Sequence, residues 1–299
     1  MSDIKSLPQD KIDEALMLLS KKYRSLDLTP GITRKVLSEC ISSLGGLFAQ
    51  ATAEGDKREW WFFRVRTKSS FSHEEDMLDP KQYTYLPKEM CINKGRCHIP
   101  GYPVFYGSDS YDCAIQEMKQ PDENEYLLSI WRLPVCKKIR LNFLCGSNIK
   151  GDRLIKNKMM ILRDACLQHK LTDSLNSGRI ISHIVAWSDL FMSPDHSISS
   201  SIAHQVLYGD FAKGKDLIAY GSALNGGYVN FALPTNLADE LEIYKIFKIK
   251  HSHEKNETTW LESADMILNS GWKKAEPNDL PHMDPLIPTG YQAIGPQNV

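Results

Sequence analysis

The sequence lacks the short motifs that identify several large enzyme classes. It contains no GxxxxGK(S/T) phosphate loop, no GxGxxG fingerprint after a strand and no GxSxG nucleophile elbow. It also lacks any CxxC pair, and its seven cysteines are odd in number and scattered. A disulfide framework is therefore not expected, and the cysteines are predicted to be reduced thiols that are mostly buried.

Long apolar runs and an excess of either charge are also absent. No uninterrupted run approaches the roughly 18 apolar residues of a membrane span, and the N-terminus MSDIKSLPQDKIDE lacks the apolar core of a signal peptide. We therefore expect a cytoplasmic protein with no membrane partner. With 36 basic and 37 acidic residues the net charge is −1, so nucleic acid is not an expected partner. The overall charge does not exclude a local basic groove.

Two groups of histidines and cysteines were considered as metal ligands. His251 and His253 alternate on one predicted strand, but no third ligand lies nearby in the sequence. Cys91, Cys97 and His98 are close together, but their spacing is not that of a zinc site. No metal is expected.

The composition of the 299 residues is that of a globular protein, with 42% hydrophobic and 24% charged residues. The apolar residues recur at helical spacing in some segments and at strand spacing in others. Because the predicted helices and strands do not alternate as regular βαβ units, we expect an α+β fold. The N-terminal helices are predicted either to pack on the main domain or to form a partner or dimer surface. Helices are expected at 9–24, 33–53, 110–119 (capped by Ser108 or Asp109), 153–170 and 197–208, and strands at 59–67, 103–106, 125–133, 138–144, 216–220, 228–233 and, last, 241–250.

The most informative segment is Gly95–Lys119, GRCHIPGYPVFYGSDSYDCAIQEMK. A loop shaped by glycine and proline leads into a strand ending at Tyr106, and a turn then begins a helix that carries Glu117. This strand–turn–helix arrangement can bring an aromatic ring and a carboxylate to one cleft. On the residues alone, however, Tyr106 is more often packing and Glu117 more often a solvated carboxylate.

The segment resembles the core motif of the RES domain family. The matching residues are Gly95-Arg96, Pro100-Gly101, Val104-Phe105-Tyr106 and Ala114-Ile115-Gln116-Glu117. The family's arginine strand is matched by Phe62-Phe63-Arg64-Val65-Arg66, and its later signature by Ile218-Ala219-Tyr220-Gly221-Ser222 and Asn230-Phe231-Ala232-Leu233. The sequence departs from the family at Cys97-His98-Ile99, at Gly221 and at Ala223-Leu224.

The resemblance implies a mixed sheet core like that of ADP-ribosyltransferases, with flanking helices, acting on NAD. It implies a helical N-terminal extension at 1–57, an NAD-binding catalytic domain at 58–250 and a C-terminal extension at 251–299. It also implies a toxin of a toxin–antitoxin pair, with an antitoxin as a partner. Alternatively, the N-terminal helices and the 68–83 loop restrain the enzyme within the molecule.

By the same resemblance, the catalytic residues are Arg64, Tyr106, Glu117 and Ser222, and further nucleotide contacts come from Arg66, Arg96, Tyr220 and Asn230. Glu117 would stabilise an oxocarbenium-like ribose, Tyr106 would stack on nicotinamide, and Arg64 would hold a phosphate or the ribose. Arg64 and Arg66 face the same side of a strand, so either can be the key arginine. Arg96 can instead be the phosphate ligand, or it can simply hold its loop. The expected reaction is cleavage of NAD, the alternatives being ADP-ribosyl transfer to a macromolecule or binding without turnover.

Overall fold

A computed structural model describes most of the chain outside its middle and its two ends. The described residues are 9–24, 26–43, 51–54, 59–71, 77–118, 124–134, 139–144, 187, 191–192, 196–212, 214–221, 229–252 and 254–276. The predicted helix at 153–170 lies outside this set, as do Ser222, His253 and the tail beyond residue 276.

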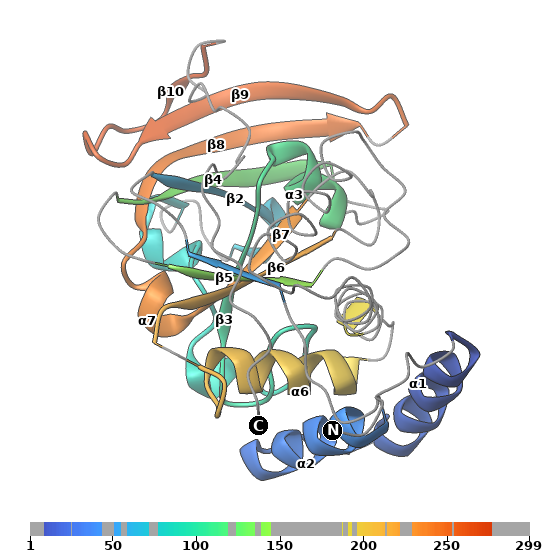
Figure 1. Cartoon of the computed structure of the whole chain (residues 1–299). Helices are drawn as coiled ribbons and strands as arrows, with labels where there is room; N and C mark the ends of the chain where they lie inside the picture. The colour runs from blue at the N-terminus through green and yellow to red at the C-terminus, as the bar shows by residue number, and fades with distance from the viewer. Residues whose placement is uncertain are drawn as a thin grey trace, which may run out of the picture.

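The described strands form one ten-stranded sheet, and the fold is α+β as expected (Figure 1). Neighbouring strands are antiparallel except β5 and β6, which are parallel. In sheet order the strands are β1 (Ala51–Glu54), β5 (Arg140–Leu144), β6 (Asp216–Gly221), β7 (Val229–Pro234), β3 (Val104–Ser108), β2 (Trp60–Thr67), β4 (Glu125–Leu133), β8 (Glu242–Ser252), β9 (Glu257–Asp265) and β10 (Lys273–Lys274).

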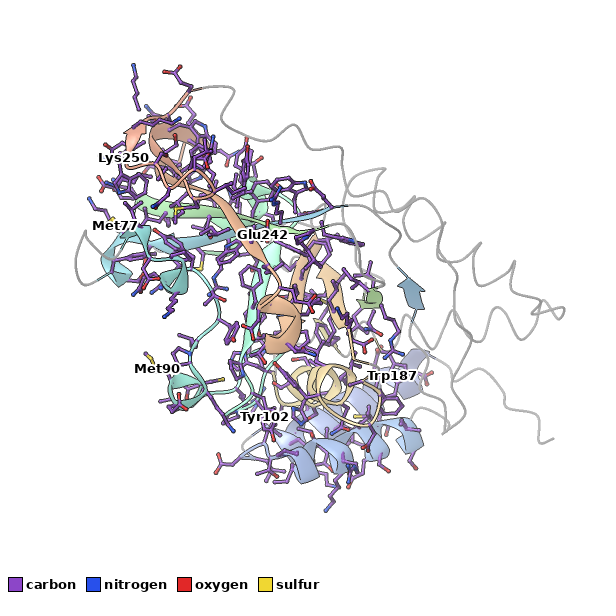
Figure 2. The ribbon with its side chains drawn as sticks, turned by 90° about the vertical axis from the view of Figure 1, so that its left-hand side faces the viewer. Met77, Met90, Tyr102, Trp187, Glu242 and Lys250 are labelled. Atoms are coloured by element: carbon purple, nitrogen blue, oxygen red, sulfur yellow. The ribbon has the colours of Figure 1, made fainter. Side chains whose placement is uncertain are left out.

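Helix α6 (His196–Leu207) packs on one face of the β3–β7–β6 part of the sheet. All of its residues from Ser197 to Leu207 are buried, because α1 (Gln9–Tyr23) and α2 (Pro30–Ser43) cover its outer side. Figure 1 shows this three-layer order of sheet, α6 and N-terminal helices. Trp187 lies beside α6, far from Met77 and Lys250 at the other end of the molecule (Figure 2). The N-terminal helices therefore pack on the main domain.

Two further clusters complete the core. Short helix α3 (Tyr111–Glu117) covers β2, β4 and β8 through Ala114 and Ile115. On the sheet face opposite α6, aromatic side chains of β2, β3, β4 and β7 pack edge to face, and α7 (Thr235–Ala238) closes this cluster with Leu237 and Ala238. Strand β4 is buried at almost every position because it lies in the middle of this arrangement.

Several predicted elements agree with the structure, and three differ from it. The helix expected at 33–53 is α2, which ends at Ser43, and Ala51–Glu54 instead pairs with β5 as a strand. The predicted helix contained Gly45-Gly46, which weakens a helix, and the edge of β5 supplies backbone partners to the residues beyond. The cap of α3 is Ser110, whose side chain accepts from the Asp112 N–H, rather than Ser108 or Asp109.

The third difference is at the C-terminal side. The strand predicted as the last one is β8, but β9 and β10 follow it and extend the same sheet past residue 250. Strand β9 contains Thr258, Thr259 and Trp260, which favour a strand and were overlooked. The 3₁₀ turns η1 (Lys68–Ser70) and η3 (Pro80–Gln82) lie in the described part of the 68–83 segment, and η4 (Lys88–Met90) precedes the Gly95–Gly101 loop.

Four cysteines, Cys40, Cys91, Cys97 and Cys113, are buried free thiols, which confirms the expectation for them. Among the helices that the structure describes, none has the length and apolar character needed to cross a membrane.

The aromatic cluster yields a test of the fold. Phe62 is fully buried and packs edge to face on Phe105 and Phe231. We expect Phe62→Ala to lower the free energy of unfolding by about 3–5 kcal/mol, because it leaves a cavity between the strands. Urea unfolding followed by circular dichroism measures this. Leu268→Ala, at a residue 76% exposed, is the control and should change stability by less than about 0.5 kcal/mol. A loss below about 1 kcal/mol for Phe62→Ala would contradict the packing described.

Candidate functional site

A pocket of about 500 Å³ lies where strands β2 and β3 separate. These two strands share one register pair, Phe63 with Ser108, whereas β2 pairs with β4 along its whole length. Beyond that pair the strands diverge, and α3 closes one side of the opening with Ala114, Glu117 and Met118. The volume lies within the range of small-molecule sites.

One row of paired residues crosses the sheet along the pocket. Tyr220 of β6 pairs with Asn230 of β7, and Asn230 pairs in turn with Ser108 of β3. Directly paired residues project from the same face of a sheet. All three line the pocket, together with Tyr106, two residues before Ser108 on the same strand.

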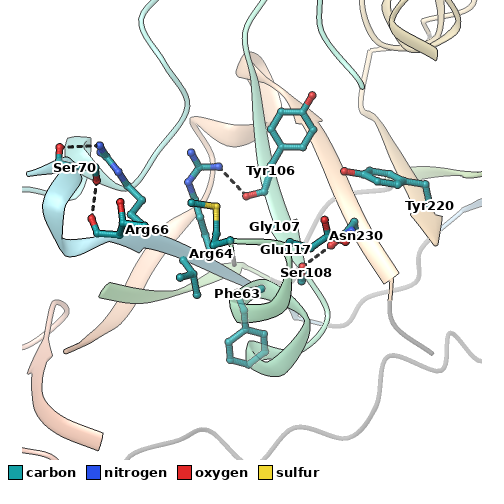
Figure 3. Close-up of a pocket in the computed structure, with 14 residues that line it drawn as sticks. Phe63, Arg64, Arg66, Ser70, Tyr106, Gly107, Ser108, Glu117, Tyr220 and Asn230 are labelled. Carbon is teal, nitrogen blue, oxygen red and sulfur yellow. Dashed lines mark hydrogen bonds between the residues drawn. The ribbon is translucent and has the colours of Figure 1, made fainter. Parts of the chain in front are cut away.

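Arg64 spans the opening between the two strands. Its Nη1 donates to the Tyr106 backbone oxygen at 2.9 Å, and its guanidinium lies 5.4 Å from the centre of the Phe105 ring (Figure 3). Its Nε is buried without a hydrogen-bond partner, and no ion pair joins Arg64 to a carboxylate of the described residues. Burial, and to a lesser degree the charge of Arg66, lower the pKa of Arg64 to about 10. A partly buried cation of this kind is suited to an anionic ligand.

Arg66, the other candidate arginine, is committed to the backbone. Its guanidinium donates to the carbonyl oxygens of Gln82 and Ser70 and lies 4.7 Å from the centre of the Phe71 ring. It thereby ties η1 and η3 to β2. Both arginines line the pocket, but the geometry favours Arg64 as the one available to a ligand.

Tyr106 presents its ring to the pocket while its hydroxyl is held from behind. The hydroxyl accepts from the Cys97 N–H at 2.9 Å and lies 2.8 Å from His98 Nδ1. Gly95 and His98 close a small bridge in this loop, and any side chain at Gly95 would overlap the His98 ring. Burial raises the pKa of Tyr106 well above its usual value. The loop that resembles the family motif therefore fixes the angle of this ring, and the phenol stays protonated.

Glu117 is the last residue of α3 and lies at the exposed rim of the pocket. Asn230 Nδ2 donates to its Oε1 at 2.8 Å. Tyr220 lies close enough for the negative charge of Glu117 to add to the main effect, burial, in raising the pKa of the phenol well above its usual value. Figure 3 shows Glu117 beside Asn230, with Tyr106 and Tyr220 above them and the two arginines on the opposite side.

The structure thus brings together six of the eight residues expected at the site: Arg64, Arg66, Tyr106, Glu117, Tyr220 and Asn230. Arg96 does not line the pocket, because its Nη1 donates to the Phe191 backbone oxygen at 2.8 Å on the α6 side. Ser222 lies outside the described residues. This contact agrees with the second of the two roles considered for Arg96, in which it holds its loop.

Ser108 is a pocket residue that the sequence interpretation missed. It is buried, and its hydroxyl donates to Asn230 Oδ1 at 2.5 Å. Its spacing from Tyr106 on a strand was a usable signal, since residues two apart share a face. Gly107 between them lets β3 approach β2, because a Cβ there would lie 3.1 Å from both Phe62 Cβ and Phe105 Cε1.

The pocket therefore has a cationic side and an anionic rim, with aromatic rings between them. Within the described residues, no cluster of three histidine, cysteine or acidic side chains is arranged to hold a metal ion. The chemistry that this arrangement supports is recognition of a ligand with an anionic group and a ring, whose reacting centre becomes positive beside Glu117.

Comparisons with known proteins add no family to this geometry: no protein-family model, curated protein or solved structure matches the chain.

Arg64 yields a test of the anion site. The folded pKa of about 10 lies below the usual 12.5, so protonated Arg64 destabilises the folded protein at every pH below about 10. We expect Arg64→Met to raise the free energy of unfolding at pH 7 by about 1–2 kcal/mol, after allowing for the lost bond to Tyr106. Inorganic phosphate should raise the Tm of the original protein and not that of the variant.

Arg34→Met is the matched control, because Arg34 is an exposed arginine of α2 paired with Asp210. It should keep the response to phosphate and change stability by less than about 1 kcal/mol. Equal phosphate responses in the protein and in Arg64→Met would show that Arg64 does not bind the anion.

Proposed function

We propose that this chain is a RES-type enzyme that cleaves the bond between nicotinamide and ribose in NAD. The observation that carries the proposal is the convergence, in one pocket, of a buried arginine, a fixed tyrosine ring and a carboxylate held by a neutral donor. These are the three residue types of the motifs that resemble the family, and they come from β2, β3 and α3.

The charges of the pocket suggest how NAD would lie. A diphosphate or ribose oxygen would meet the guanidinium of Arg64, which lines the pocket. The nicotinamide ring would stack on Tyr106, because that hydroxyl is already engaged and only the ring is presented. The nicotinamide ribose would then lie beside Glu117 at the rim.

The chemistry needs only these groups. Cleavage moves the electron pair of the glycosidic bond onto the pyridinium nitrogen, so nicotinamide leaves neutral and needs no proton. The ribose carbon becomes oxocarbenium-like, and the negative charge of Glu117 stabilises it. Water, inorganic phosphate or a macromolecular nucleophile then bonds to that carbon and loses its proton.

A second candidate function is ADP-ribosyl transfer to a protein or nucleic acid. Glu117 is exposed at the rim rather than enclosed, and this position gives a large acceptor access to the reacting carbon. Binding of a nucleotide without turnover is the third reading, supported by the departure from the family at Ala223-Leu224.

We further propose that the activity is cytotoxic in the cytoplasm and is restrained by an antitoxin. The exposed rim gives an inhibitory segment access to the pocket. Restraint by the N-terminal helices has less support, because α1 and α2 pack against α6 and do not line the pocket. The 68–83 segment is better placed, since Ser70 lines the pocket.

The test is release of nicotinamide from NAD by the purified chain, with products identified by mass spectrometry. We expect Glu117→Gln to lower kcat by about 100-fold or more, because it keeps the shape and removes the charge that stabilises the transition state. Glu89→Gln, at an exposed glutamate of η4, is the matched control and should retain full activity. Equal rates for Glu117→Gln and the original protein would reject the role of Glu117.

The same reaction, run with NAD labelled in its adenosine part and with cell lysate, separates the candidates. Label confined to small molecules supports cleavage, label on macromolecules supports transfer, and unchanged NAD beside measurable binding supports the third reading.

A further inference from the structure

We infer that Ser108 and Asn230 are positioning residues that orient the Glu117 carboxylate and leave it charged. The effect of this positioning on the rate of NAD cleavage rests on the proposed function, whereas the hydrogen-bond arrangement itself does not. The prediction that Asn230 contacts the nucleotide stays a prediction, and its bond to Glu117 adds a positioning role. Ser108, expected to cap a helix, instead donates to Asn230.

The orientation of the Asn230 amide is determined by its neighbours. Its Oδ1 accepts from the Ser108 hydroxyl at 2.5 Å and from the Cys113 thiol at 3.5 Å. An ionised carboxylate only accepts hydrogen bonds, so the amide atom that faces Glu117 Oε1 at 2.8 Å must be the nitrogen. The amide oxygen then points the other way, toward the hydroxyl and the thiol, which donate to it.

The two positioning residues lie on paired strands in the buried part of the site. Ser108 and Asn230 are register partners across β3 and β7, and they are only 3% and 5% exposed. Glu117, by contrast, ends a seven-residue helix and is exposed. A long exposed side chain otherwise samples many rotamers, so the bond from Asn230 selects one of them.

The chemical nature of the donor matters as much as its position. An arginine or lysine at residue 230 would hold the carboxylate but also neutralise it. An amide carries no net charge, so it fixes Glu117 and leaves the negative charge to act on the positive ribose. The buried Ser108 hydroxyl in turn anchors the amide by donating to its oxygen, and the flipped amide is excluded because its oxygen would face the Glu117 oxygen.

The first experiment observes the arrangement itself, without NAD. In ¹⁵N-labelled protein, the side-chain amide protons of Asn230 are identified by their loss in Asn230→Asp. We expect Ser108→Ala to speed their exchange with solvent by about three- to tenfold, as for the loss of one hydrogen bond. Ser108→Thr, which keeps a hydroxyl, should retain slow exchange. Unchanged exchange in Ser108→Ala overturns the inference whether or not NAD is a substrate.

The second experiment measures nicotinamide release. We expect Ser108→Ala to lower kcat by about three- to tenfold with KM within about twofold, and Ser108→Thr to restore kcat. Ser42→Ala, at an exposed serine of α2, is the matched control. Equal kcat values for Ser108→Ala and the original protein overturn the positioning role while the proposed function stands. No turnover by the original protein rejects the proposed function, and the exchange experiment then decides the inference alone.

Discussion

The separation of β2 from β3 after one pair of residues is the constraint on which the rest of the site depends. A sheet that opens in its middle leaves backbone groups without ladder partners, and burial of such groups is costly. Arg64 supplies a hydrogen bond to one such group, because its guanidinium donates to the Tyr106 backbone oxygen across the opening. The same side chain thus satisfies a backbone oxygen at the opening and supplies the cation of the pocket, so a substitution of Arg64 alters both.

The electrostatics of the site follow from what is paired and what is not. Elsewhere in the described chain, buried charge is compensated, as in the Arg140–Asp216 ion pair between β5 and β6. Arg64 receives no comparable compensation from the described carboxylates, and its lowered pKa records the cost of that burial. Unfavourably buried charged groups of this kind are concentrated at ligand-binding sites. Glu117, on the other side of the pocket, is by contrast exposed to solvent, and the Asn230 amide donates to it.

How much of this could be predicted from the sequence depends on how local the cause is. The strand of Phe62 and Arg64 and the strand–turn–helix from Tyr106 to Glu117 follow from nearby residue patterns, and both were predicted. That the two meet at one pocket rests on the order β7–β3–β2–β4, which is set by pairings between distant segments. Arg96 illustrates the same limit: only the position of Phe191 explains why it turns away from the pocket.

The loop behind Tyr106 has a consequence for the beginning of the chain. Lys94, which precedes that loop, donates from Nζ to the Arg24 backbone oxygen at the end of α1 and to the Ser197 hydroxyl of α6. The end of the first helix is therefore tied to the start of the loop that holds the Tyr106 hydroxyl, across a separation of 70 residues in the sequence. Displacement of α1 would remove one of the contacts that anchor this loop, at a point outside the pocket.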